Sequence, residues 1–337
     1  MRALAALDLA ERVVAVSTVV DQTEFRMHDG QRMWVMPVGN LSRAAGAPTV
    51  IVGRSELLGI LASAVGDVPI RYGERCLELN QGPEHVDLHF ASGRKERFDG
   101  LVGADGLHSD VRARMLGATA PRSVGQDAWV GIASYSTDLL PLGRTIATIG
   151  RGLRFCSAAM RGGRVFWYAA VRSDEGISST RALALRFGHF HSPVEDVILA
   201  TRETDAVRTV VRDRPPARAW GSGRVTLVGD AAHPSTPDLG QGACQALESA
   251  VVLSDCLAQR TVPSAFAQYQ ERRLDRTAKI TNLSWLTAMQ GASLNPLVNG
   301  LRAASMRTLF PSLATTELSW ILSGHGLPEG REDTLEW

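Results

Sequence analysis

The stretch that decides the fold is residues 224–257, RVTLVGDAAHPSTPDLGQGACQALESAVVLSDCL. Its compact apolar run at 225–228 is typical of a strand buried on both faces of a parallel sheet. Gly229 and Asp230 follow, then a loop with two prolines, and then Gly240-Gln241-Gly242 at the start of a predicted helix. The order of strand, glycine-rich turn and helix indicates an open α/β sheet, in which ligands bind at the carboxyl ends of the strands.

Each part of this stretch suits a flat, ribityl-linked ring. Asp230 at the end of its strand can accept a hydrogen bond from a ribityl or ribose hydroxyl. Gly240 and Gly242 let the backbone approach a flat ring, and the helix that starts there directs free N–H groups and a positive dipole end at it. The N1–C2=O edge of a reduced, anionic flavin needs such donors. The alternative, a strand–helix connection that happens to contain glycine, explains one glycine pair but not the whole string.

Two further stretches indicate phosphate contacts. In LVGADGLHSDVR (101–112) a short apolar strand ends at Asp105-Gly106, and Ser109 can cap the following helix. Such a turn places backbone amides at a phosphate-binding position, although Asp-Gly is also the commonest turn pair. Arg54 precedes a predicted helix at 55–65, where it could hold a pyrophosphate with two hydrogen bonds. By itself Arg54 would be read as a surface arginine.

The chain resembles the single-component flavin-dependent aromatic hydroxylases and epoxidases, the family that includes p-hydroxybenzoate hydroxylase. Within that family it is most similar to the urate hydroxylase and zeaxanthin epoxidase branch. The resemblance covers nearly the whole chain and rests on four stretches: GADGLHSDVR, GDAAHPSTPDLGQGACQALESAVVL, RSELLGIL and YQERRLDRTAKI. It implies an α/β fold with a Rossmann-like FAD-binding domain, an inserted β-sheet substrate domain and C-terminal helices.

The resemblance also implies an activity and its site. FAD would be reduced by NAD(P)H, and O2 would be captured as a flavin C4a-hydroperoxide. Oxygen would then be transferred to a small aromatic or polyketide-like substrate. The matching cofactor-binding positions are Arg54, Asp105, Gly106, Asp230, Pro237, Gly240, Gln241, Gly242 and Ala243. NADH and NADPH are not distinguished, and the substrate itself is not readable.

For the substrate pocket the resemblance points to Arg154, which falls where the urate hydroxylase branch has a functional arginine. The aromatic partner that some relatives carry as tyrosine is Phe166 here. An arginine beside aromatic rings could orient an anionic or phenolic substrate. A charged residue on the solvated face of a sheet is an equally good interpretation of Arg154. His233 resembles a catalytic base, but a structural role is the more common one in this motif.

The chain divides into four segments. Residues 1–118 are predicted to form the first part of the FAD-binding domain, with a helix near the start and residues 15–36 joining the substrate sheet through a turn at Asp29-Gly30. Residues 119–215 read as a β-rich substrate domain with one wet face. Residues 216–292 complete the FAD-binding domain with two long helices. Residues 293–337 read as a helical tail with a break at Pro311. A helix at 55–65, capped by Ser55, should bury a leucine stripe.

One unit of the family pattern is not found in these 337 residues. The family opens with a strand, a GxGxxG turn and a helix that hold the adenylate, whereas MRALAALDLAERV matches the helix that follows this unit. Sheet edges that are normally covered should therefore be exposed. Three explanations stay open: a gene start placed too late, a truncated inert product, or a non-redox homologue acting as a small-molecule binding or interaction protein. The intact flavin motifs favour the first.

Composition excludes several other classes. The net charge is +1 and no basic block occurs, which argues against a nucleic-acid partner. No run approaches 18 uncharged apolar residues, so no membrane-spanning helix is predicted. The four cysteines show no metal-ligand spacing and are interpreted as reduced thiols of a cytoplasmic protein. The expected partners are a small-molecule substrate and O2, with no metal, and the oligomeric state is not predicted.

Overall fold

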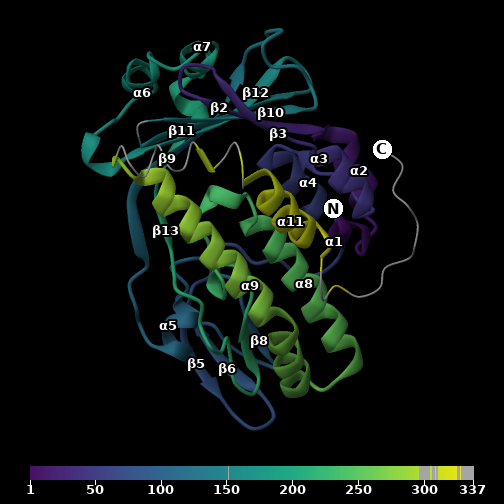
Figure 1. Cartoon of the computed structure of the whole chain (residues 1–337). Helices are drawn as coiled ribbons and strands as arrows, with labels where there is room; N and C mark the ends of the chain where they lie inside the picture. Colours follow the sequence, from purple (N-terminus) through teal and green to yellow (C-terminus); the bar gives the residue numbers. More distant parts are fainter. Residues whose placement is uncertain (151, 296–303, 306–307, 309, 325–326, 328–337) are drawn as a thin grey trace.

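A seven-stranded sheet forms the upper part of the molecule in the computed structural model, which describes residues 1–150, 152–295, 304–305, 308, 310–324 and 327 (Figure 1). Its strand order is β13-β9-β12-β11-β10-β2-β3, and all neighbours are antiparallel except β10 and β2. The strands are β2 (Gln22–Met27), β3 (Arg32–Met36), β9 (Arg122–Ser134), β10 (Arg144–Gly150), β11 (Leu153–Met160), β12 (Arg164–Arg172) and β13 (Ala206–Asp213). The early hairpin β2–β3 therefore lies in the same sheet as the strands of residues 119–215.

The two faces of this sheet differ in burial because the side chains alternate. One face packs on α6 (Thr180–Phe187) and α7 (Val194–Leu199), and its central residue Trp167 is completely buried. The other face was expected to be wet. It instead faces the rest of the molecule, where the long helices lie below the sheet (Figure 1). Its residues are mostly half-buried, so this face borders an enclosed region rather than bulk solvent.

A second core lies under two long helices, α8 (Gly242–Gln259) and α9 (Val262–Ala292). They cover a parallel pair of strands, β8 (Leu101–Gly103) and β14 (Val225–Leu227), and Trp220, Phe266 and Tyr269 fill the space between them. A three-stranded antiparallel sheet, β5 (Cys76–Gln81), β6 (Val86–Phe90) and β7 (Lys95–Phe98), and helix α5 (Asp110–Leu116) flank this core. The parallel pair places the carboxyl ends of both motif strands side by side.

The remaining elements are α1 (Arg2–Ala5), α2 (Ala10–Val16), β1 (Thr18–Val19), α3 (Val38–Ala44), β4 (Val50–Ile51), α4 (Arg54–Ala64) and α11 (Phe310–Leu322). Of these, α1 packs on α8, α2 packs on α1 and α4, and α3 packs on α11. The one helix expected near the start is broken in two, because Asp8 has a φ of 56°. Pro311 is the second residue of α11, where a proline costs no helical hydrogen bond. Residue 309, just before this helix, lies outside the described residues, so the expected break there stays a prediction. Residues 296–303 of the expected helical tail lie outside the described residues.

Helix α4 forms where its periodicity predicts it, but two details of that prediction are wrong. Its N-cap is Gly53 and not Ser55. The Gly53 N–H donates a hydrogen bond of 2.9 Å to the Glu56 carboxylate. None of its residues is fully buried. Leu58 is exposed, as are Val68, Ile70 and Tyr72 in the segment after the helix.

Within the described residues β8 has a single strand partner, β14. An exposed sheet edge was expected here.

Candidate active site

Asp230 and Arg54, predicted from separate motifs, come together in the structure. After β14 the chain turns through Gly229, with a φ of 60°, into the short helix η3 (Gly229–Ala231). Asp230 remains accessible to solvent but is crowded by protein atoms. This partial desolvation raises the pKa of its carboxyl group, and the nearby Arg54 charge lowers it. The carboxylate can therefore receive a hydroxyl donor while Arg54, the first residue of α4, supplies positive charge beside it.

The start of α8 is open to a ligand. Helix η4 (Pro237–Leu239) leads into Gly240, with a φ of 64°, and α8 begins two residues later. The side chain of the N-cap residue Gln241 accepts no hydrogen bond from the first backbone N–H groups of α8, so these groups lack a side-chain cap. A Cβ atom built on Gly240 would meet nothing within 4 Å, and Ala243 is exposed. Accessible N–H donors beside open space and an accessible carboxylate fit the ring and ribityl parts of a flavin.

The Asp105-Gly106 turn lies at the end of the neighbouring strand. Asp105 accepts a hydrogen bond at 3.2 Å from the Val111 N–H, and Ser109 caps α5 by accepting from the Arg112 N–H at 2.8 Å. Gly106 has a φ of 79°, and a Cβ there would enter open space. The Arg112 guanidinium donates to the carbonyl oxygens of Ala231 and Ala232. Sequence reasoning missed this arginine, which ties the two motif loops together.

Arg154 connects the seven-stranded sheet to the glycine-rich loop. It projects from β11 and forms an ion pair with Asp238 of η4, whose side chain is 0% exposed. The guanidinium also donates to the Gln126 amide oxygen at 2.7 Å. The end of α9 packs closely on Arg154, because a Cβ on Gly291 would lie 2.6 Å from its Nε atom. Asp238 and Gln126 were not predicted, since nothing local in the sequence links them to residue 154.

The tyrosine nearest to Arg154 is Tyr168. Strand β12 pairs with β11 so that Phe166 lies opposite Ala158 and Tyr168 opposite Cys156. Both aromatic residues thus share the face of Arg154. The Tyr168 hydroxyl is buried and makes no hydrogen bond within the described residues. Burial raises the pKa of this hydroxyl and the Arg154 charge lowers it, so the phenol is neutral near pH 7. Period-two alternation was the signal that could have identified Tyr168 beside Phe166.

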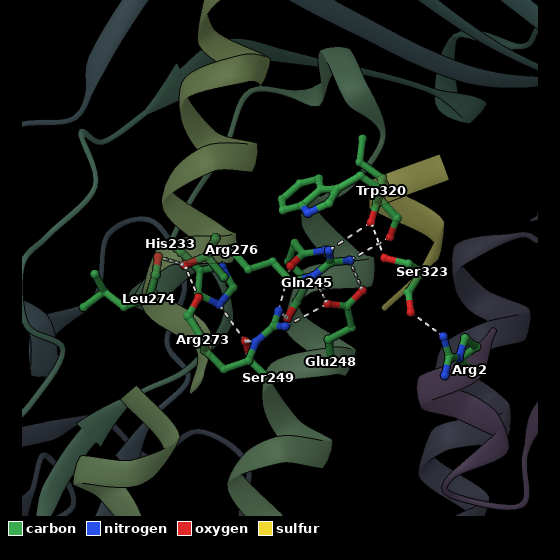
Figure 2. A network of polar contacts seen from close by, with 12 residues as sticks. Arg2, His233, Gln245, Glu248, Ser249, Arg273, Leu274, Arg276, Trp320 and Ser323 are labelled. Carbon is green, nitrogen blue, oxygen red and sulfur yellow. Dashed lines mark hydrogen bonds and ion pairs between the residues drawn. The ribbon is translucent and has the colours of Figure 1, made fainter. Parts of the chain in front are cut away.

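The surroundings of His233 indicate a structural role for its ring. Its ring is buried, contacts Trp220 and shares a hydrogen bond of 2.9 Å with the Ser249 hydroxyl of α8 (Figure 2). Burial, with a smaller effect from the Arg273 charge, lowers the pKa of His233 to about 3. A neutral buried imidazole that is held by a helix positions the loop after η3. It is not placed to take a proton from a substrate at pH 7.

We expect the stability of the protein to fall as the pH drops from about 6.5 towards 3. The folded-state pKa of His233 is about 3 against an ordinary value of 6.5, so only the unfolded chain binds this proton in that window. The loss approaches about 1.4 kcal/mol per pH unit. Urea unfolding at pH 5, 6 and 7 measures it. The His233→Gln variant should lose this slope, whereas the exposed His108→Gln variant should keep it; equal slopes would refute the assignment.

The part of the chain that the structure describes gives little support for a metal site or a membrane-spanning helix. No cluster of three His, Cys, Asp or Glu side chains that could hold a metal occurs there. None of the helices among the same residues is long and apolar enough to cross a bilayer. A hollow of about 450 Å³ opens between α3 and α11, lined by Leu41, Thr315, Thr316, Ser319, Trp320 and Ser323. None of these is a predicted site residue.

This arrangement defines a class of protein. An α/β unit of the kind that binds nucleotides holds its glycine-rich loop against a large, mostly antiparallel sheet. The family model described as FAD binding domain matches residues 1–284. The chain belongs to this family of FAD-binding monooxygenases and hydroxylases, as its named relatives also indicate. FAD is accordingly its cofactor class, although the 337 residues contain no GxGxxG turn for the adenylate.

Relatives give the scale of the similarity. The chain is 35% identical over 285 residues to aurachin C monooxygenase/isomerase of Stigmatella aurantiaca, covering 83% of this chain and 74% of that protein. It is 32% identical over 293 residues to 3-amino-4-hydroxybenzoate 2-monooxygenase of Streptomyces cremeus, covering 83% and 73%. Zeaxanthin epoxidase of Solanum lycopersicum is 29% identical over 356 residues, and the chain spans 53% of its length.

Solved structures share the fold. Klebsiella pneumoniae HpxO complexed with FAD and uric acid matches with a TM-score of 0.86 at 24% identity, covering 95% of this chain and 86% of that one. A salicylate hydroxylase substrate complex matches with a TM-score of 0.79 at 21% identity, covering 95% and 85%. The α/β architecture with a large sheet and carboxyl-terminal helices is therefore confirmed.

Proposed function

We propose that the chain acts as an FAD-dependent, NAD(P)H-consuming monooxygenase that hydroxylates or epoxidises a small aromatic or polyketide-like substrate. The Arg154–Asp238 ion pair is the observation that carries this proposal. It holds the loop that precedes α8 against one face of the seven-stranded sheet. A flavin ring on that loop would then lie beside the sheet face that presents Arg154, Phe166 and Tyr168. The names of the relatives, several of which act on aromatic compounds, support the same class.

The residues have separate tasks in this proposal. Asp230 would hold ribityl or ribose hydroxyls, Arg54 would lie by the phosphate chain, and the Asp105-Gly106 turn would approach the pyrophosphate. The N–H groups at the start of α8 would stabilise negative charge on the ring. Residues that would border the ring are Pro237, Gly240, Gln241, Gly242 and Ala243. When bound, FAD supplies the redox chemistry and activates oxygen.

Arg154 and Tyr168 would bind the substrate. A buried guanidinium offers fixed N–H donors to an anionic or phenolic oxygen, and its position is set by Asp238 and Gln126. Tyr168 adds a neutral hydroxyl on the neighbouring strand. Burial of both groups strengthens these contacts because water does not screen them. Orientation of the substrate and exclusion of water are thus the contributions of the sheet.

Asp230→Ala is expected to weaken FAD binding about 10- to 100-fold, because a hydrogen bond to a charged group contributes about 1.5–3 kcal/mol. Quenching of flavin fluorescence on titration with the purified 337-residue chain measures the dissociation constant. Asp138→Ala, which removes an exposed carboxylate in the connection between β9 and β10, serves as the control and should leave the dissociation constant unchanged. Equal affinities for the two variants would contradict the role given to Asp230.

A second function would use the same sheet face. The Arg154 Nε and the Tyr168 hydroxyl, both buried without a hydrogen-bond partner among the described residues, could bind a small molecule in a non-redox homologue without flavin. NAD(P)H oxidation and O2 consumption, measured with FAD and a panel of phenols, separate the two. Substrate-stimulated oxidation supports the monooxygenase, whereas phenol binding without flavin binding supports the alternative. The four free thiols of the structure favour a reducing compartment such as the cytoplasm for either function.

A further inference from the structure

The sheet face that carries Arg154 continues across three more strands as an apolar wall. The register of the strands shows which residues belong to this wall. Ile149 lies opposite Arg154, Met27 lies beside Ile149, and Phe25 lies beside Ala147. On the edge strand, Trp34 lies opposite Phe25 and Met36 opposite Thr23. Directly paired residues point to the same side of a sheet. We define the apolar wall as Phe25, Met27, Trp34, Met36, Ala147 and Ile149.

Burial shows that this wall borders accessible space. All six residues are half-buried, whereas Ile146, Phe155 and Trp167 on the opposite face are fully buried. The rings of Phe25 and Trp34 stack with centroids 5.3 Å apart and planes within 12°, so together they form a flat surface. Helix α11 packs near β3 at this end, and α9 packs on β9 and β11 at the Arg154 end, so helices flank the wall on both sides.

The other end of the same face is polar and incompletely bonded. The Arg154 Nε and the Tyr168 hydroxyl are both buried, and neither has a hydrogen-bond partner within the described residues. Buried polar atoms normally have partners, so two such atoms from neighbouring strands on one sheet face point to a group that is bound there. One oxygen atom that accepts a hydrogen bond from the guanidinium and shares a hydrogen bond with the Tyr168 hydroxyl would satisfy both groups. An acidic hydroxyl on an aromatic ring is such a group.

We propose that the site binds an amphiphilic aromatic compound: its acidic ring hydroxyl meets Arg154 and Tyr168, and an apolar substituent lies along the apolar wall towards Phe25 and Trp34. Three strand intervals separate β11 from β3, which gives the substituent about 14 Å of wall. This inference rests on the proposed function for where the chemistry happens. Binding by the sheet can nevertheless be measured without flavin or turnover.

Affinity should rise with the length of the substituent. Each methylene buried on the wall is expected to tighten binding about four-fold. Isothermal titration calorimetry of the purified chain with 4-methyl-, 4-butyl- and 4-heptylphenol measures this increment at one site per chain. The matching methyl ethers lack the hydroxyl proton, and we expect them to bind about 10-fold more weakly. Affinity that does not depend on chain length would overturn the proposal.

Two variants locate the effect. Trp34→Ala should reduce the increment per methylene, and Met27→Ala, a smaller change nearer to Arg154, should do the same for butyl and heptyl substituents. Tyr72→Ala is the control, because the Tyr72 ring is 86% exposed and the residue belongs to no strand of the seven-stranded sheet. Thermal melts of all three variants report whether they fold. Loss of the increment in Tyr72→Ala but not in Trp34→Ala would assign the binding to the outer surface and overturn the proposal.

The outcome for the wall is independent of the outcome for the flavin. A length-dependent affinity in a chain that binds no FAD would retain the amphiphilic ligand and refute the monooxygenase. Length-independent binding, in a chain that binds FAD and oxidises NAD(P)H, would refute the amphiphilic ligand alone.

Discussion

Replacing Arg154 with methionine is expected to lower the free energy of unfolding by about 3–5 kcal/mol, the usual cost of removing one partner from a buried ion pair. Asp238 would be left as a completely buried carboxylate without its ion-pair partner. Methionine replaces the aliphatic part of the arginine side chain, so the loss reports mainly the missing guanidinium and its charge. Urea unfolding of the variant and the parent at pH 7 measures the difference.

A second substitution separates stability from binding. Adding Asp238→Asn to Arg154→Met removes the stranded charge, and the double variant should recover most of the lost stability. It should not recover affinity for phenols, because the guanidinium that receives the hydroxyl is still absent. Arg172→Met, which breaks an exposed pair with Asp174, is the matched control and should change stability little. A single Arg154→Met variant as stable as the parent would show that the pair does not hold the loop.

Local patterns made much of the cofactor half predictable. The apolar run at 225–228, the glycine-rich turn and the helix after it each depend on neighbouring residues, and the structure places β14, η4 and α8 there. The Ser109 cap was likewise predictable, because its partner is the N–H three residues on. The Ser55 cap was not predictable in the same way. Glu56 reaches back to Gly53, and the two candidate caps lie only two residues apart.

Long-range pairings explain what the sequence could not predict. Arg154 meets Asp238 only because β11 and η4 come from different halves of the chain, and no spacing encodes that contact. Tyr168 was passed over for Phe166, since the choice between two residues on one face depends on how β11 and β12 are aligned. The leucine stripe of α4 identified a helix correctly, but periodicity does not say what covers the stripe, and Leu58 is exposed. The roles of these residues stay predictions.

Glu248→Gln is expected to destabilise the protein by about 3–5 kcal/mol, because it leaves two buried arginines without a counter-charge. The Arg-rich stretch of α9 turns two of its arginines inwards to this carboxylate (Figure 2). Arg273 is 0% exposed and donates to Glu248 at 2.8 Å and to the Gln245 amide oxygen at 2.6 Å. Arg276 donates to both Glu248 oxygens and to the Ile321 carbonyl oxygen of α11. One carboxylate thus joins α8, α9 and α11.

The pH dependence of this network gives an independent test. Burial alone would raise the pKa of Glu248, but the hydrogen bond from Arg276 and the two arginine charges outweigh it and lower the pKa below 4.5. The stabilisation is therefore present above pH 4.5 and is lost as the pH falls through the folded-state pKa. In urea unfolding series from pH 7 to pH 3, Glu248→Gln should lose this acid-dependent part, because glutamine does not titrate. Glu271→Gln removes an exposed carboxylate of α9 and should keep the parent profile. If both variants follow that profile, Glu248 does not carry the charge balance, and the arginines must be compensated by their carbonyl and amide contacts alone.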